Sequence, residues 1–114
     1  MYSDIILEKI QRLKAYLSLC RRYCRHGVSN RGDSYSIRYI AIGVYRLLES
    51  LQSLGTVLRF EPQCCDIIKR VYEIGKAMFV ARYSAYTDEQ ILETLCSACP
   101  CIEWAIAGEQ AQFH

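Results

Sequence analysis

Four stretches of the chain carry apolar residues at alternating spacings of three and four, and this periodicity constrains the fold more than any other feature. Such spacing places apolar side chains along one side of an α-helix, because the helix completes a turn every 3.6 residues or so. In the first stretch the repeating residues are Ile6, Ile10, Leu13, Leu17, Cys20 and Cys24. The pattern predicts an all-α chain whose helices pack along apolar seams.

Capping residues, prolines and glycines mark the ends of the expected helices. The expected helices run from Ser3 to Gly27, from about Ser34 to Leu54, from Pro62 to about Tyr86 and from Asp88 to Gly108. Ser3 is a good N-cap, and Thr87 with Gln90 forms a capping-box pattern before the last helix. Pro100 lacks the N–H that a helix needs, so the fourth helix is expected to be kinked there.

The connections between these helices are short, which specifies antiparallel neighbours. We therefore expect a single-domain, up-down-up-down four-helix bundle over residues 1–114. A chain of 114 residues with 52% apolar residues is long enough to bury one core.

The chain has seven cysteines, and their number is evidence on the cellular compartment in which the protein resides. The number is odd, and the first residues carry an early acidic residue and no unbroken apolar run, which is not typical of a secretory signal. We expect a cytoplasmic protein with free thiols. No apolar run approaches the roughly 20 residues of a membrane helix, so a soluble protein that does not bind a membrane is expected.

Four cysteines lie on the seams of the first and fourth helices, where they raise the question of a metal site. If the first helix ends level with the start of the fourth, Cys20 lies ~7 Å and Cys96 ~12 Å from that end, whereas Cys24 lies at the end and Cys99 ~16 Å away. Thiols at such different heights do not form a four-thiolate site. We expect no metal and no cofactor, and we interpret these cysteines as small buried hydrophobic residues.

Cys20 with Cys24, and Cys96 with Cys99, are nevertheless same-face pairs that suit two-coordinate Cu(I). In this respect the chain resembles the copper-storage four-helix bundles, whose lumens are lined with cysteine, and the resemblance implies Cu(I) binding as a further hypothesis. Ile, Leu, Val and Met fill most lumen positions here, which favours core packing. Cys96, Cys99 and Cys101 flank Pro100, where a broken turn can leave thiols accessible.

Positive charge gathers where the first helix ends and the second begins. Residues 1–59 carry a net charge of +6 and residues 60–114 a net charge of −4, for the total of +2. The candidate nucleic-acid-binding residues are Arg21, Arg22, Arg25, His26, Arg31 and Arg38. Guanidinium groups interleaved with tyrosines suit phosphates and unstacked bases, so RNA or DNA binding is the alternative function. Glu89 and Glu93 are expected near Arg25 and Arg21, where they would cancel part of the field.

Arg21 and His26 are separated by four residues, which is similar to the Arg-x4-His signature of HEPN-type ribonucleases. That resemblance covers six residues and implies that Arg21 stabilises phosphate charge and that His26 acts in acid-base transfer. A histidine at a helix end also suits the helix dipole without any catalysis. The other histidine is the last residue, His114, so a catalytic triad has only His26 to use, and we expect no enzyme.

Apolar residues also lie off the seams of the first two helices. The candidate protein-interface residues are Tyr16, Leu19, Tyr23, Tyr35, Tyr39 and Ile42. Stripes of tyrosine with arginine are typical of protein interfaces, although a wide buried face would give the same pattern. We therefore expect a small non-enzymatic binding module, such as an adaptor, an oligomeric accessory factor or an inhibitor. Its expected partner is another protein or a second copy of itself, and no small-molecule substrate is evident.

Overall fold

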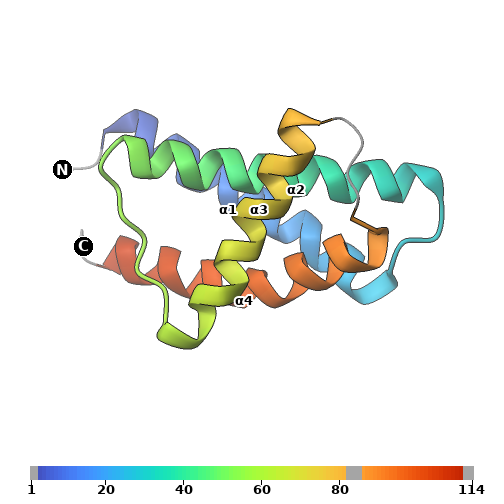
Figure 1. The fold of residues 1–114 in the computed structure, drawn as a ribbon. Coiled ribbons are helices and arrows are strands. Elements are labelled where there is room, and N and C mark those ends of the chain that lie inside the picture. The colour runs from blue at the N-terminus through green and yellow to red at the C-terminus, as the bar shows by residue number, and fades with distance from the viewer. Residues whose placement is uncertain (1–2, 82–85, 112–114) are drawn as a thin grey trace.

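In the computed structural model, the described residues 3–81 and 86–111 form four α-helices and one short 3-10 helix (Figure 1). The elements are α1 (Asp4–His26), α2 (Arg31–Ser53), η1 (Pro62–Cys64), α3 (Cys65–Val80) and α4 (Asp88–Ala111). This part of the chain holds no strand. The predicted all-α four-helix bundle is confirmed.

Helix α1 runs antiparallel to both α2 and α4, whereas the shorter α3 crosses the bundle steeply (Figure 1). Contacts join α3 to α2 and to α4. The backbone of α3 approaches α2 closely at Gly75, where an added Cβ would lie 2.3 Å from the Cβ of Tyr45. Only glycine permits this close approach. Because of this tilt, the end of α3 lies far from where it would be in a bundle whose four helix axes run side by side.

The ends of α1 and the start of α4 agree with the sequence prediction. The side chain of Ser3 accepts a hydrogen bond from the backbone N–H of Ile6, and Gly27 ends the helix with a positive φ of 73°. The capping box is formed at α4, where the backbone N–H of Thr87 donates to Gln90 Oε1 at 2.9 Å and the N–H of Gln90 donates to Thr87 Oγ1 at 3.1 Å. These are the reciprocal bonds that satisfy free N–H groups at a helix start.

Helix α2 begins three residues earlier than expected, at Arg31 rather than Ser34. Asn30 is the N-cap, and its side-chain oxygen accepts a hydrogen bond from the backbone N–H of Asp33 at 2.8 Å. Asp33 and Ser34 are also residue types that cap helices, but neither caps this one. Asp33 instead accepts hydrogen bonds from Ser29, which tightens the turn before the helix.

The third and fourth helices also differ from the predicted ranges. Pro62 lies in η1, and α3 itself begins at Cys65 and ends at Val80. The predicted extension toward Tyr86 passes through residues 82–85, which lie outside the described residues. Helix α4 continues through Pro100 to Ala111, and its axis bends about halfway along (Figure 1).

The predicted seams form the core, with α1 contributing Ile10, Leu13, Leu17 and Cys20. Leu51 of α2 is fully buried, whereas Leu54, which follows it at helical spacing, is 46% exposed. The difference arises because α2 ends at Ser53, so that Leu54 leaves the helical face.

By length and apolar composition, α4 is the helix within the described residues that could cross a membrane. About half of its apolar window, 44%, is buried inside the bundle. A core helix of a bundle has the same composition, so this match is weak evidence for a membrane span.

Candidate functional site

The candidate protein-interface residues lie at the surface where α1 and α2 meet, which we term the α1–α2 seam. Leu19, Tyr35 and Tyr39 are 42%, 67% and 65% exposed. Tyr16, Tyr23 and Ile42 are half-buried and pack against the core. The stripes are therefore partly core and partly surface, and the most exposed residues, Tyr35 and Tyr39, are aromatic.

An apolar hollow of about 300 Å³ opens in this seam. It is lined by Leu19, Tyr23, Tyr35, Ser36, Tyr39 and Ile40. Four of these six belong to the residues predicted for protein contact. Packed tyrosine rings around a shallow apolar recess are the kind of surface that protein interfaces use.

A second hollow, of about 220 Å³, follows along the same seam and is basic. It is lined by Lys9, Arg12, Tyr16, Gly43, Arg46, Leu47 and Ser50. The guanidinium of Arg46 lies 4.8 Å from the centre of the Phe79 ring, which adds an exposed aromatic from α3 to this side. Guanidinium and aromatic groups attract each other at this distance.

Tyr16 and Tyr39 stand between the two hollows, with ring centres 5.7 Å apart. The side-chain hydrogen bond to Tyr39, together with burial, raises the pKa of Tyr16 above its ordinary value. Gly43 makes room for this ring, because an added Cβ would lie 2.4 Å from Tyr16 Cζ. The two tyrosines thus form a fixed ridge in the seam.

The cations of the second hollow were not among the candidate site residues. A signal was present, since Lys9 and Arg12 precede Tyr16 and Leu19 at helical spacing on the same face of α1. The partner Arg46 on α2 could be assigned only from the register of the two helices.

The candidate nucleic-acid-binding residues divide into two groups, of which the first is neutralised by α4. Arg21 forms an ion pair with Glu103. Arg38 forms one with Asp88, which also accepts a hydrogen bond from Ser34 Oγ at 2.7 Å. The hydrogen bonds from Arg38 and then from Ser34 hold the pKa of Asp88 below its ordinary value.

The second group is exposed at the turn between α1 and α2. Arg22, Arg25, His26 and Arg31 make no ion pair or side-chain hydrogen bond with another described residue. Arg21 and His26 project from α1 in directions roughly 140° apart, because His26 lies five positions after Arg21 on the helix. One chain therefore does not bring together the two residues on which the ribonuclease resemblance rests.

The predicted register of α1 against α4 is wrong. Glu89 and Glu93 do not pair with Arg25 and Arg21, and Arg21 contacts Glu103 instead. The first turns of α4 extend past the end of α1 to the start of α2, where Asp88 meets Ser34. The prediction placed the start of α4 level with the end of α1. Because α3 crosses the bundle steeply, the start of α4 need not lie at that level.

Four of the seven cysteines form disulfides, so the expectation that all thiols are free is wrong. Cys24 is bonded to Cys96, and Cys64 is bonded to Cys101. Cys20 and Cys99 are free and buried, and Cys65 is free and exposed. The cytoplasmic location expected from the sequence stays a prediction.

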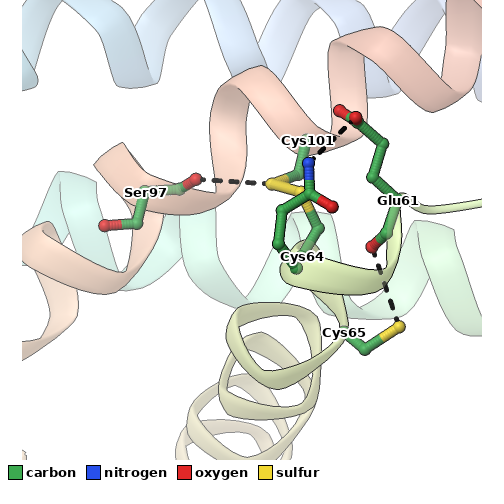
Figure 2. The surroundings of a disulfide bond; sticks show 6 residues. Glu61, Cys64, Cys65, Ser97 and Cys101 are labelled. Carbon is green, nitrogen blue, oxygen red and sulfur yellow. Dashed lines mark hydrogen bonds between the residues drawn. A yellow bond between two sulfur atoms is a disulfide. The ribbon is translucent and has the colours of Figure 1, made fainter.

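Figure 2 shows the second disulfide, which ties the start of α3 to the middle of α4. Cys64 can reach α4 because α3 crosses the other helices instead of running beside them. The neighbouring Cys65 donates to the carbonyl oxygen of Glu61 at 3.8 Å and faces away from the disulfide.

The first disulfide belongs to a cluster of four sulfurs between α1 and α4. The expectation that these four cysteines lie at different heights along the helices is therefore wrong. Cys20 Sγ lies 3.8 Å from Cys24 Sγ. A hydrogen bond between Cys20 and Cys99 lowers the pKa of Cys20 and, together with burial, raises that of Cys99. In this oxidised state no group of three His, Cys, Asp or Glu side chains among the described residues is arranged to hold a metal ion.

Comparisons of the chain with protein-family models, with curated proteins and with solved structures find no match. The candidate site is therefore defined by geometry and chemistry. Its leading feature is the seam between α1 and α2, where an apolar and a basic hollow lie on either side of a tyrosine ridge.

Proposed function

We propose that this protein is a non-enzymatic binding module whose α1–α2 seam binds an amphipathic segment of another protein. The observation that carries the proposal is the pair of hollows, one apolar and one basic, on a single continuous seam. A module of this kind acts as an adaptor, an accessory factor or an inhibitor by occupying the surface of its partner.

The apolar hollow is suited to large hydrophobic side chains of the partner. Its exposed residues Leu19, Tyr35 and Tyr39 lose contact with water when a partner covers them, and this burial favours association. Tyrosine is enriched among the residues that dominate binding energy, because it presents a large area with few rotatable bonds.

The basic hollow is suited to carboxylates. Lys9, Arg12 and Arg46 present positive charge to one recess, where charge-assisted hydrogen bonds to Asp or Glu are strong. The centres of the two hollows are about nine residues apart along the helices, which is roughly 13 Å. A partner helix would thus place its apolar anchors about two and a half turns from its acidic residues.

Charge also favours a different protein over a second copy on this seam. Two copies meeting through the same face would place the basic hollow of one chain against either the basic or the apolar hollow of the other, and neither hollow supplies carboxylates for Lys9, Arg12 and Arg46. Like charges that face each other at an interface disfavour the pairing. An acidic amphipathic partner has the opposite charge.

A designed helical peptide tests the proposal. It carries three leucines at one end and three glutamates nine residues away, and its matched control carries lysines in place of the glutamates. We expect the glutamate peptide to bind. The double variant Leu19→Ser with Tyr39→Ala should lower the affinity for this peptide by at least about tenfold, since truncation of a central interface anchor costs more than about 1 kcal/mol. Fluorescence anisotropy of the labelled peptide measures this change.

Trp104→Ala is the matched control, because Trp104 is an exposed aromatic on α4, outside the seam. It should leave the affinity unchanged. Equal affinity for the lysine peptide, or an equal loss in Trp104→Ala, would contradict the proposal. Sedimentation that shows a dimer broken by Tyr39→Ala would identify a second copy as the occupant instead.

The alternative function is nucleic-acid binding through the turn between α1 and α2. The observation that favours it is the group of exposed cations Arg22, Arg25 and Arg31, which have no ion pair within the described residues. Such groups are available to phosphates and release counterions when they bind.

Arg22→Ala with Arg25→Ala tests this alternative. If both arginines contact phosphates of a single-stranded oligonucleotide, their loss should reduce the slope of log K against log salt by about 1.4. Lys69→Ala with Arg70→Ala removes two exposed cations from α3 and is the matched control. Filter binding over a salt series measures the slope, and absence of binding at low salt rejects nucleic-acid binding.

A further inference from the structure

We propose that Cys20, Cys24, Cys96 and Cys99 form a four-thiolate site for Zn²⁺ when the Cys24–Cys96 disulfide is reduced. The site lies between α1 and α4 and is separate from the α1–α2 seam. It goes beyond the proposed binding function and does not depend on it.

The four sulfurs already lie in one cluster. Cys20 and Cys24 are four residues apart on α1, and Cys96 and Cys99 are three apart on α4, so each pair shares a helix face. The Cα atoms of Cys24 and Cys96 are 5.7 Å apart across the two helices. The buried thiols of Cys20 and Cys99 lie close enough to interact, which joins the second pair across the same gap.

The spacing of the sulfurs agrees with tetrahedral zinc. With Zn–S bonds of about 2.3 Å, adjacent sulfurs of a tetrahedral site lie ~3.8 Å apart. Cys20 Sγ and Cys24 Sγ are 3.8 Å apart in the oxidised protein. Once their bond is broken, the sulfurs of Cys24 and Cys96 need only side-chain rotation to move apart to the same spacing.

The surroundings of the cluster suit a closed structural site. Cys20 and Cys99 are 1% and 4% exposed, so no solvent competes for the inner side of an ion. Cys24 is exposed and Cys96 is half-buried, which leaves a path by which the ion can enter. Structural zinc sites take four protein ligands and no water.

Reduction of the Cys24–Cys96 disulfide precedes zinc binding. A dithiol reductant supplies two electrons and two protons, the Cys24–Cys96 bond becomes two thiols, and the reductant becomes a disulfide. Zinc then binds four thiolates and releases four protons. In the oxidised protein Cys24 and Cys96 are bonded to each other and cannot serve as ligands.

Titration of the fully reduced protein with Co²⁺ under nitrogen tests the proposal. We expect one Co²⁺ per chain, with the intense visible absorption of a tetrahedral thiolate site, and full displacement by Zn²⁺. Cys20→Ser and Cys99→Ser should each weaken binding by more than the roughly tenfold that loss of an outer partner costs. Cys65→Ser removes a free, exposed thiol outside the cluster and should change nothing.

The oxidised protein should bind no Co²⁺ in the same titration. Absence of tetrahedral absorption in reduced protein that retains its helical circular dichroism would overturn the proposal. It would also be overturned if Cys20→Ser and Cys99→Ser bound Co²⁺ as tightly as the unchanged protein. If reduction unfolds the bundle, Zn²⁺ should restore the helical signal, and failure to restore it would also overturn the proposal. Binding of Cu(I) without Zn²⁺ would also reject the tetrahedral site.

Discussion

Replacement of Cys24 and Cys96 by alanine is expected to lower the free energy of unfolding by about 4 kcal/mol. The two cysteines are 72 residues apart, and a cross-link over so long a loop removes much of the freedom of the unfolded chain. The Cys64–Cys101 disulfide spans 37 residues, so its removal should cost about 0.6 kcal/mol less. Equilibrium unfolding in guanidinium chloride without reductant measures both.

Cys65→Ala is the control for this comparison, since Cys65 is exposed and unbonded, and its change should lie within about 0.5 kcal/mol of zero. Thiol counting gives an independent check. The unreduced protein, unfolded in denaturant, should show three reactive thiols of the seven cysteines. A count of seven would contradict the cysteine pairing described here.

Leu51→Ala is expected to destabilise the bundle by about 2 to 5 kcal/mol. Leu51 is fully buried in the core, where the smaller side chain loses its apolar contacts and leaves a cavity. In a domain of this size the expected fall in melting temperature is at least about 8 °C. Thermal unfolding followed by circular dichroism measures it.

Leu54→Ala is a closely matched control for that prediction. Leu54 lies three residues later, just past the end of α2, and is 46% exposed. Its replacement should change the free energy of unfolding by no more than about 0.5 kcal/mol. Similar costs at the two positions would show that α2 continues as a buried stripe, as the sequence pattern alone predicts.

The helices could be predicted because their signals are local. The apolar repeat through Ile10, Leu13 and Leu17 sets the buried face of α1, and the capping box of Thr87 and Gln90 sets the start of α4. The start of α2 was misplaced because several capping residues compete before it. Asn30 reaches the backbone N–H of Asp33, and the carboxylate of Asp33 is occupied by Ser29.

The relative positions of the helices could not be predicted, because they depend on packing between distant residues. The tilt of α3 is associated with the close approach of Gly75 to Tyr45, and nothing local to either residue indicates it. That tilt moves Cys64 to Cys101, and the register of α4 sets Cys96 opposite Cys24. The odd number of cysteines led to the expectation of free thiols. Four bonded and three free cysteines also make an odd total, so the count does not exclude disulfides.

The tyrosines of the candidate seam could be found from the sequence, whereas the basic hollow could not. Tyr35 and Tyr39 lie off the apolar seam of α2 at helical spacing, which marks them as surface residues. The basic hollow needs Arg46 of α2 to lie opposite Lys9 and Arg12 of α1. That arrangement follows from the antiparallel register of two helices, which helix periodicity does not determine.

Hydroxyl-radical footprinting with the glutamate peptide tests most directly whether the α1–α2 seam is the binding surface. Bound peptide should protect Tyr35 and Tyr39 from oxidation, because both rings are largely exposed in the free protein and line the apolar hollow. Trp104, which is exposed on α4, should be oxidised equally with and without peptide. Protection of Trp104 with unchanged oxidation of Tyr35 and Tyr39 would contradict the proposed binding surface.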